Sequence, residues 1–196
     1  MMADDVAALM DAEEITQAHI AGLSMGGAIA QELALRHPAK VDRLVLVSTW
    51  AKCDHYMKRV FGHFKEVRAK VSLDEFMQLL LLWIWTPAWM EAHDEDMAQA
   101  CVDAAANENP QPQAGFNGQC DACINHNTVD RLGFITAPTL ITVGTLDIFT
   151  PLACSEFLHA HIPGSQLQLF SKSGHVHHWE ELEAFNAVTT NFLLGE

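Results

Sequence analysis

The stretch Ile20-Ala-Gly-Leu-Ser-Met-Gly-Gly-Ala28 decides the fold of this chain. Its apolar beginning predicts a short strand over Ala18–Leu23, and Met25–His37 has the composition of a helix that Pro38 ends. Between the two lies the pattern G-x-S-x-G, with Ser24 at its centre. The sequence therefore predicts a strand, a tight turn that carries a serine, and a helix, one directly after the other.

A serine in such a turn is suited to nucleophilic attack, because the turn lifts Ser24 out of the sheet. We expect Gly22 and Gly26 to be required, since a Cβ atom two residues to either side would collide with the turn. Gly27 would keep the helix close to the sheet. The N–H of Met25 would be one donor of an oxyanion hole. A glycine-rich turn with an incidental serine is the alternative interpretation.

The rest of the chain alternates strands and helices at both ends and is helical in between. Further strands are predicted over 42–48, 138–144 and 166–170, and further helices over 4–14, 151–162 and 180–194. The middle contains only predicted helices, over 56–70, 72–83, 94–106 and 114–125, and one that Pro87 begins. The pattern predicts an α/β fold with a mostly parallel sheet of about four strands. Residues 1–50 and 133–196 would form its core, and residues 51–132 a helical cap.

A nucleophilic serine needs a base, and the base needs an orienting group. Asp147 and His175 each follow a predicted strand, at the edge where parallel sheets gather their ligand sites. We therefore expect Ser24 to act as nucleophile, His175 as base and Asp147 as the acid that orients the base.

Other interpretations of these residues remain open. Asp147 could be a helix N-cap, and His177 or His178 could replace His175 as the base, although only His175 directly follows the glycine turn. The run His175-Val-His-His178 could also suggest a metal site, as could His159-Ala-His161. Neither group has a convincing carboxylate or cysteine complement, so no metal site is predicted.

Composition narrows the class of partner. The net charge of −14 argues against nucleic acid and against an anionic membrane surface. The longest apolar run, Leu79–Trp85, is too short to span a bilayer, and the acidic N-terminus lacks the pattern of a signal peptide. Five cysteines at irregular spacing predict free thiols, including the C-x-x-C pair Cys120 and Cys123. We expect a cytoplasmic protein.

The motifs together resemble the α/β-hydrolase superfamily, especially the group with 3-oxoadipate enol-lactonases and related small esterases. That family also carries its serine, acid and histidine in this chain order. The resemblance implies hydrolysis of a small ester or lactone through an acyl-enzyme, with no metal or organic cofactor. Its blocks extend over nearly the whole chain: 22–28, 34–38, 43–47, Gly144-Thr-Leu-Asp147 with Pro151, and Gly174-His175 with Glu180.

The chain departs from the family before Ser24. The family's sheet has eight strands in the order 1-2-4-3-5-6-7-8, and the strand that leads to the serine is the fifth. We therefore expect a truncated α/β-hydrolase fold without the first four strands. The loop that usually gives the second oxyanion donor would also be missing, which predicts a rate lower by about 10²–10³. Ala18–Leu23 would then be an open apolar edge, and we expect a homodimer through it.

The substrate pocket is predicted from position alone. Ile148 follows the acid, Val176 follows the base and Trp50 follows the second strand, so these three should line it. An aromatic roof from residues 76–85 would favour small to medium uncharged esters or lactones. Another reaction on the same residues, such as acyl-homoserine lactone or C–C bond hydrolysis or perhydrolysis, is the first alternative. An inactive half-fold that associates with itself is the second.

Overall fold

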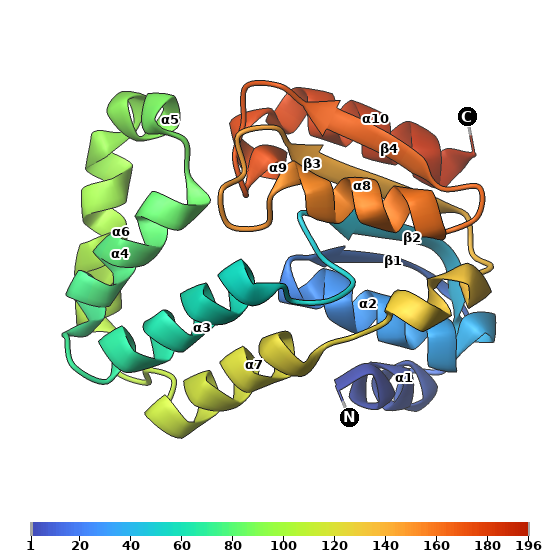
Figure 1. The fold of residues 1–196 in the computed structure, drawn as a ribbon, viewed down its shortest axis with the longest axis horizontal. Helices are drawn as coiled ribbons and strands as arrows, with labels where there is room; N and C mark the ends of the chain where they lie inside the picture. Colours follow the sequence, from blue (N-terminus) through green and yellow to red (C-terminus); the bar gives the residue numbers. More distant parts are fainter. Residues whose placement is uncertain (1, 196) are drawn as a thin grey trace.

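A parallel sheet forms the centre of the protein. The computed structural model describes residues 2–195, and within them the sheet has four strands in the order β1-β2-β3-β4. All neighbouring strands are parallel, and the pairings of Leu23 with Val47 and of Gly144 with Phe170 bring their carboxyl ends together. The predicted sheet is thus confirmed. Its strands are β1 (Ala18–Leu23), β2 (Val41–Val47), β3 (Thr139–Gly144) and β4 (Gln166–Phe170) (Figure 1).

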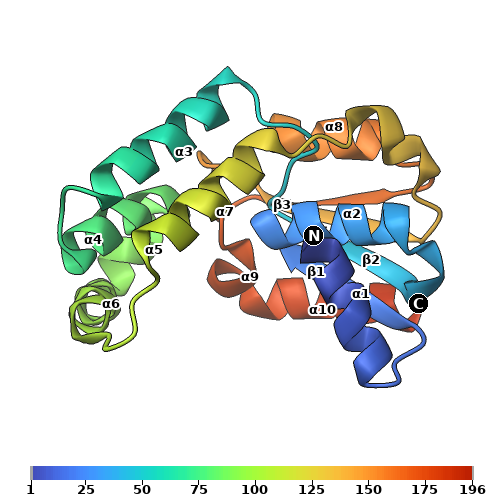
Figure 2. The same cartoon turned by 90° about the horizontal axis from the view of Figure 1, so that it is seen from below.

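Helices cover both faces of this sheet (Figure 2). One face packs against α2 (Met25–Arg36) and α8 (Leu152–His161), and the other against α10 (Leu182–Leu194), which the short helix α9 (His177–Glu180) precedes. The helix α1 (Met2–Ala12) packs against α2. Burial on both sides explains why strand β2 is apolar without alternation.

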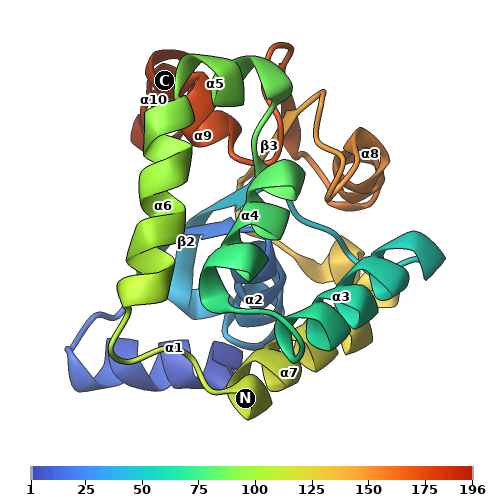
Figure 3. The same cartoon turned by 90° about the vertical axis from the view of Figure 1, so that its left-hand side faces the viewer.

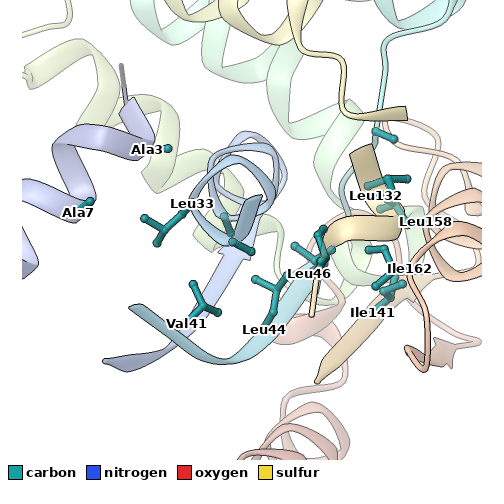
Figure 4. Close-up of a cluster of buried hydrophobic side chains, with 14 residues drawn as sticks. Ala3, Ala7, Leu33, Val41, Leu44, Leu46, Leu132, Ile141, Leu158 and Ile162 are labelled. Atoms are coloured by element: carbon teal, nitrogen blue, oxygen red, sulfur yellow. The ribbon is translucent and has the colours of Figure 1, made fainter. Parts of the chain in front are cut away.

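The largest group of buried apolar side chains lies on the α2 and α8 side of the sheet (Figure 4). Leu44 and Leu46 of β2 meet Leu33 of α2 and Leu158 of α8 there, and each is at most 1% exposed. The intervening residues Val45 and Val47 point the other way and pack with Phe192 of α10. The two-residue period of the strand thus divides one apolar run between two cores.

Residues 51–132 contain five α-helices, which lie together beyond the carboxyl edge of the sheet (Figures 1 and 3). Ser72 and Glu75 form a capping box at the second of these helices, and Asp54 caps the first by accepting from the N–H of Met57. The role of this helical segment as a cap stays a prediction at this point. Its helices are α3 (His55–Arg68), α4 (Leu73–Ile84), α5 (Pro87–Ala92), α6 (Asp94–Ala106) and α7 (Gln113–Asn125).

Three short elements were not predicted: the 3-10 helices Pro38–Lys40 and Val129–Phe134, and α9 as a helix of its own. The predicted closing helix is divided because Glu181, with φ −127° and ψ 48°, leaves the helical conformation between α9 and α10. Within residues 2–195 no helix is both long enough and apolar enough to cross a membrane.

Strand β1 lies at the edge of the sheet in the part of the chain that the structure describes. Its residues alternate in exposure, and His19, Ala21 and Leu23 are exposed. Unpaired backbone groups along such an edge are a template for pairing with another strand. We propose on this basis that two copies associate through β1.

Light scattering at micromolar concentration tests this association. We expect a dimer for the native chain and a monomer for Ala21→Lys, because a charged side chain on an edge strand disfavours strand pairing. Ala114→Lys adds the same charge at an exposed position on α7 and should leave the dimer intact. A native chain that is a monomer would contradict the proposal.

Candidate active site

Ser24 sits in a strained turn between β1 and α2. Its φ of 53° and ψ of −116° place a non-glycine residue in a region that side chains rarely adopt. A Cβ atom added to Gly22 would lie 2.3 Å from the carbonyl oxygen of Gly26, so only glycine fits there. The expectation for Gly26 is wrong, because a Cβ at that position meets nothing within 4 Å among the described residues.

The end of β2 holds this turn in place. The hydroxyl of Thr49 donates to the carbonyl oxygen of Ser24 at 2.7 Å. A Cβ added to Gly27 would lie 2.6 Å from the Cβ of Thr49, so this glycine allows α2 to approach the sheet as expected. Thr49 therefore fixes both the turn and the start of the helix.

The backbone N–H of Met25 is free to bind an anion. It lies in the first turn of α2 and makes no hydrogen bond within residues 2–195, whereas the N–H groups of Gly27 and Ala28 donate to the carbonyl oxygen of Ser24. Unpaired N–H groups at a helix N-terminus favour negative charge.

Asp147 is buried in the loop after β3, and its carboxylate accepts hydrogen bonds from the following residues and from His175. Its Oδ1 accepts from the backbone N–H groups of Phe149 and Thr150, both at 2.8 Å. Its Oδ2 accepts from the Thr150 hydroxyl at 2.7 Å and from His175 Nδ1 at 2.9 Å. The carboxylate does bind backbone N–H groups, as the N-cap interpretation requires, but the N-cap of α8 is Pro151.

The Asp147 carboxylate remains charged in this site. Burial raises its pKa, but the hydrogen bond and charge of His175 and the donors of Thr150 outweigh burial, so the pKa lies below its ordinary value. A charged carboxylate at Nδ1 fixes the orientation of the His175 ring and turns Nε2 away from Asp147.

Ser24 and His175 are not joined by a hydrogen bond. Within residues 2–195, no hydrogen bond from either the Ser24 hydroxyl or His175 Nε2 is found. Phe149 connects their surroundings, because its ring lies 4.8 Å from that of His175 and also lines the cavity at Ser24. The contact between Asp147 and His175 is thus formed, and the contact between His175 and Ser24 is open.

The cavity at Ser24 is small and apolar. Its volume is about 200 Å³, and Gln119 is the only amide side chain in its wall. Apart from Ser24, Met25 and Phe149, the wall comes from the helical segment: Phe61, Phe64, Leu80, Phe116, Gln119, Cys120 and Cys123.

A second and larger cavity, of about 810 Å³, lies at His175. Ile148 is 54% exposed and lines this cavity, as do Trp83 and Trp85 of the predicted aromatic roof. Val176 is buried and lines neither cavity. Trp50 is fully buried against Phe61 and lines a different cavity with Cys53 and Cys154, so the structure does not bring it to Ser24.

The neighbouring histidine His177 packs inside the protein and is not exposed at the site. It is fully buried, with one ring nitrogen 2.9 Å from the Thr142 hydroxyl and the other 3.2 Å from the Ser48 hydroxyl. Burial lowers its pKa to about 3, which keeps the ring neutral. His177 therefore ties β2 to β3 behind the site, and the geometry favours His175 over it as the base.

Glu180 connects the loop of His175 to the helical segment. Its Oε1 accepts from the N–H and the hydroxyl of Thr86 at 2.8 and 2.7 Å, and its Oε2 accepts from the N–H of Gly174. The N–H of His175 adds a bond to the carbonyl oxygen of Ile84 at 3.2 Å. The base and the wall of its cavity are held together by these contacts.

Sequence reasoning missed the residues that support the site, namely Thr49, Phe149 and Thr150, and it gave Glu180 no role. Asp147 itself carried a usable signal, because a loop aspartate often accepts from the backbone N–H groups that follow it. Thr49 carried none, since its bond to Ser24 joins two strand ends that are separate in the sequence.

All five cysteines are free, and burial raises the pKa of Cys123 to about 12. Among residues 2–195, no group of three or more His, Cys, Asp or Glu side chains could hold a metal ion.

Comparison with known proteins places the chain in a family. The model of the α/β hydrolase fold matches residues 1–182. A Caulobacter protein named "Putative carbamate hydrolase RutD" is 30% identical over 195 residues, which cover all of this chain and 72% of that protein. A hydrolase structure from Pseudomonas aeruginosa superposes with a TM-score of 0.86 at 27% identity, over 99% of this chain and 71% of the other. An enol-lactonase structure from Burkholderia xenovorans, with a TM-score of 0.87 at 24% identity, shares the fold over 98% of this chain and 71% of its own.

Stability at acid pH tests the position of His177. Because its pKa is about 3 when folded and about 6.5 when unfolded, the unfolded chain binds the extra proton as the pH falls below 6.5. The contribution of His177 to the free energy of unfolding is therefore fully present above pH 6.5 and is lost progressively as the pH falls toward 3. Between pH 7 and pH 5 the loss from this residue should be about 2 kcal/mol.

Urea unfolding of the native chain and of His177→Gln at pH 7 and at pH 5 measures how much stability His177 loses between these two pH values. The variant should lose about 2 kcal/mol less than the native chain between pH 7 and pH 5, because glutamine does not titrate in this range. Equal losses in the two proteins would show that His177 is not the buried neutral group described here.

Replacing Glu180 by glutamine tests the tie to the helical segment. One of the two oxygens becomes an NH₂ group, which faces a donor and cannot accept its hydrogen bond. We expect the free energy of unfolding to fall by about 1.5–3 kcal/mol. Glu183→Gln changes an exposed carboxylate nearby and should have no effect. Equal stability of the two variants would contradict this role.

Proposed function

Since the chain belongs to the α/β-hydrolase fold family, we propose that it is a serine hydrolase that cleaves carboxylic esters or lactones through an acyl-enzyme. Ser24 is the nucleophile, His175 the base and Asp147 the group that orients the base. The observation that carries the proposal is the strained Ser24 turn at the same sheet edge as the buried His175 and Asp147 pair.

In the first half of the reaction, His175 Nε2 takes the proton of the Ser24 hydroxyl as the oxygen attacks the carbonyl carbon. The negative charge on the tetrahedral intermediate is stabilised by the N–H of Met25. The charge of Asp147 stabilises the imidazolium. His175 then returns the proton to the leaving oxygen, the carbon–oxygen bond breaks, and the acyl group stays on Ser24.

In the second half, water takes the place of the alcohol. His175 removes a proton from the water, the resulting hydroxide attacks the acyl carbon, and the Ser24 oxygen leaves with the proton from His175. The products are the free acid and the regenerated serine. The same steps open a lactone to a hydroxy acid, because the leaving oxygen is then part of the same molecule.

The open contact between Ser24 and His175 is compatible with this mechanism. Catalytic hydrogen bonds are often long without substrate and shorten in the complex.

The walls of the two cavities support an uncharged acyl group. No lysine or arginine lines the Ser24 cavity, and Lys65 pairs with Asp121 at 2.6 Å instead. A dicarboxylate such as an oxoadipate enol-lactone would lack a counter-charge there. Hydrolysis of a carbamate is a second candidate, because the 30% identical relative is named a putative carbamate hydrolase. The segment 51–132 forms most of the wall over Ser24, which supports its proposed role as a cap.

Hydrolysis of p-nitrophenyl acetate and butyrate tests the assignment of Ser24. We expect turnover by the native chain, and a fall of at least about 10³ in kcat/KM for Ser24→Ala, because the acyl-enzyme cannot form. Ser171→Ala, an exposed serine at the end of β4, is the matched control and should keep its activity. Equal rates in the native chain and Ser24→Ala would remove Ser24 from the mechanism.

A further inference from the structure

The two cavities of the site divide a substrate into two parts. In an acyl-enzyme mechanism the acyl group remains on the serine, and the leaving group lies next to the histidine that protonates it. The small cavity lined by Ser24 therefore receives the acyl part, and the larger cavity lined by His175 receives the leaving group. This division rests on the proposed function.

The side chain of His175 connects the larger cavity to the chemistry. His175 is 4% exposed and lines this cavity, its Nδ1 is bonded to Asp147, and its Nε2 has no hydrogen-bond partner within residues 2–195. This nitrogen is not one of the fully buried unpaired atoms of the described residues, so it is accessible to a ligand. In the proposed mechanism it meets the leaving oxygen of the substrate.

The charges in the wall of this cavity are all negative. Glu91 of α5 and Asp94 at the start of α6 both line it, and no lysine or arginine does. Neither carboxylate forms an ion pair within the described residues. Their charge is therefore available to a ligand, and the net charge of −14 adds to the same potential.

Two indole rings complete the wall. Trp83 and Trp85 also line this cavity, and Trp85 stacks on Trp89 with 5.3 Å between the ring centroids. Indole faces attract cations, and quaternary ammonium groups are recognised by aromatic rings in this way. Carboxylates with aromatic rings suit an organic cation better than they suit an anion.

We propose that the cavity at His175 is a leaving-group site for a cationic alcohol, and that the preferred substrates are short-chain esters of quaternary amino alcohols. The cavity of about 810 Å³ is large enough for a trimethylammonium group, whereas the cavity of about 200 Å³ at Ser24 limits the acyl chain.

Acetylcholine and 3,3-dimethylbutyl acetate test the proposal, since they have the same shape and differ by one positive charge. Hydrolysis is followed by titration of the acid released. We expect kcat/KM to be about tenfold higher for acetylcholine at low salt, and the ratio to fall when NaCl is added. It should also fall toward one in the double variant Glu91→Gln with Asp94→Asn. Glu95→Gln, an exposed carboxylate on α6 outside the cavity, should leave the ratio unchanged.

The outcomes separate this proposal from the proposed function. A ratio below threefold in the native chain, or one that the double variant does not lower, overturns the cation site while hydrolysis of the neutral ester still supports Ser24 as nucleophile. Failure to hydrolyse either ester overturns the cation site, and turnover of p-nitrophenyl acetate by the native chain and by Ser24→Ala then decides the proposed function separately. A ratio above threefold that falls in the double variant supports both.

Discussion

The strained backbone at Ser24 is the constraint on which the rest of the site depends. A non-glycine residue at positive φ costs of order 1–3 kcal/mol, so surrounding contacts must hold it. The carbonyl oxygen of Ser24 accepts from Thr49, while Gly22 lets the chain pass the backbone of Gly26. Because Thr49 lies just beyond the end of β2, pairing of β1 with β2 brings it to the turn. Sheet formation and the conformation of Ser24 are thus linked.

The parallel sheet brings the remaining groups to the same edge. The loops after β3 and β4 carry Asp147 and His175, and His177 fixes the second of these loops to the sheet interior. The helical segment then decides what can reach them. It contributes an apolar wall at Ser24 and an aromatic, acidic wall at His175, and Glu180 ties that second wall to the loop of the base. In the proposed mechanism the sheet edge supplies the reacting groups, and the helical segment supplies most of the wall of each cavity.

The sequence predicted those parts that depend on local pattern. The strands were found because buried parallel strands are continuous apolar runs, and the turn at Ser24 because its glycines have a steric cause, which holds for Gly22 and Gly27 but not for Gly26. Contacts between distant segments were not predictable. Trp50 follows a strand as Ser24 does, yet its side chain packs on Phe61 and lines a different cavity from that of the serine. The sequence does not encode that direction locally.

Labelling with a fluorophosphonate, followed by peptide mapping, tests the central claim most directly, because it reports the reactivity of a single serine without requiring a substrate. The account predicts an adduct on Ser24 and much slower labelling when His175 is replaced by glutamine, since the base that activates the hydroxyl is lost. An unlabelled Ser24, or an adduct that forms equally fast without His175, would contradict it.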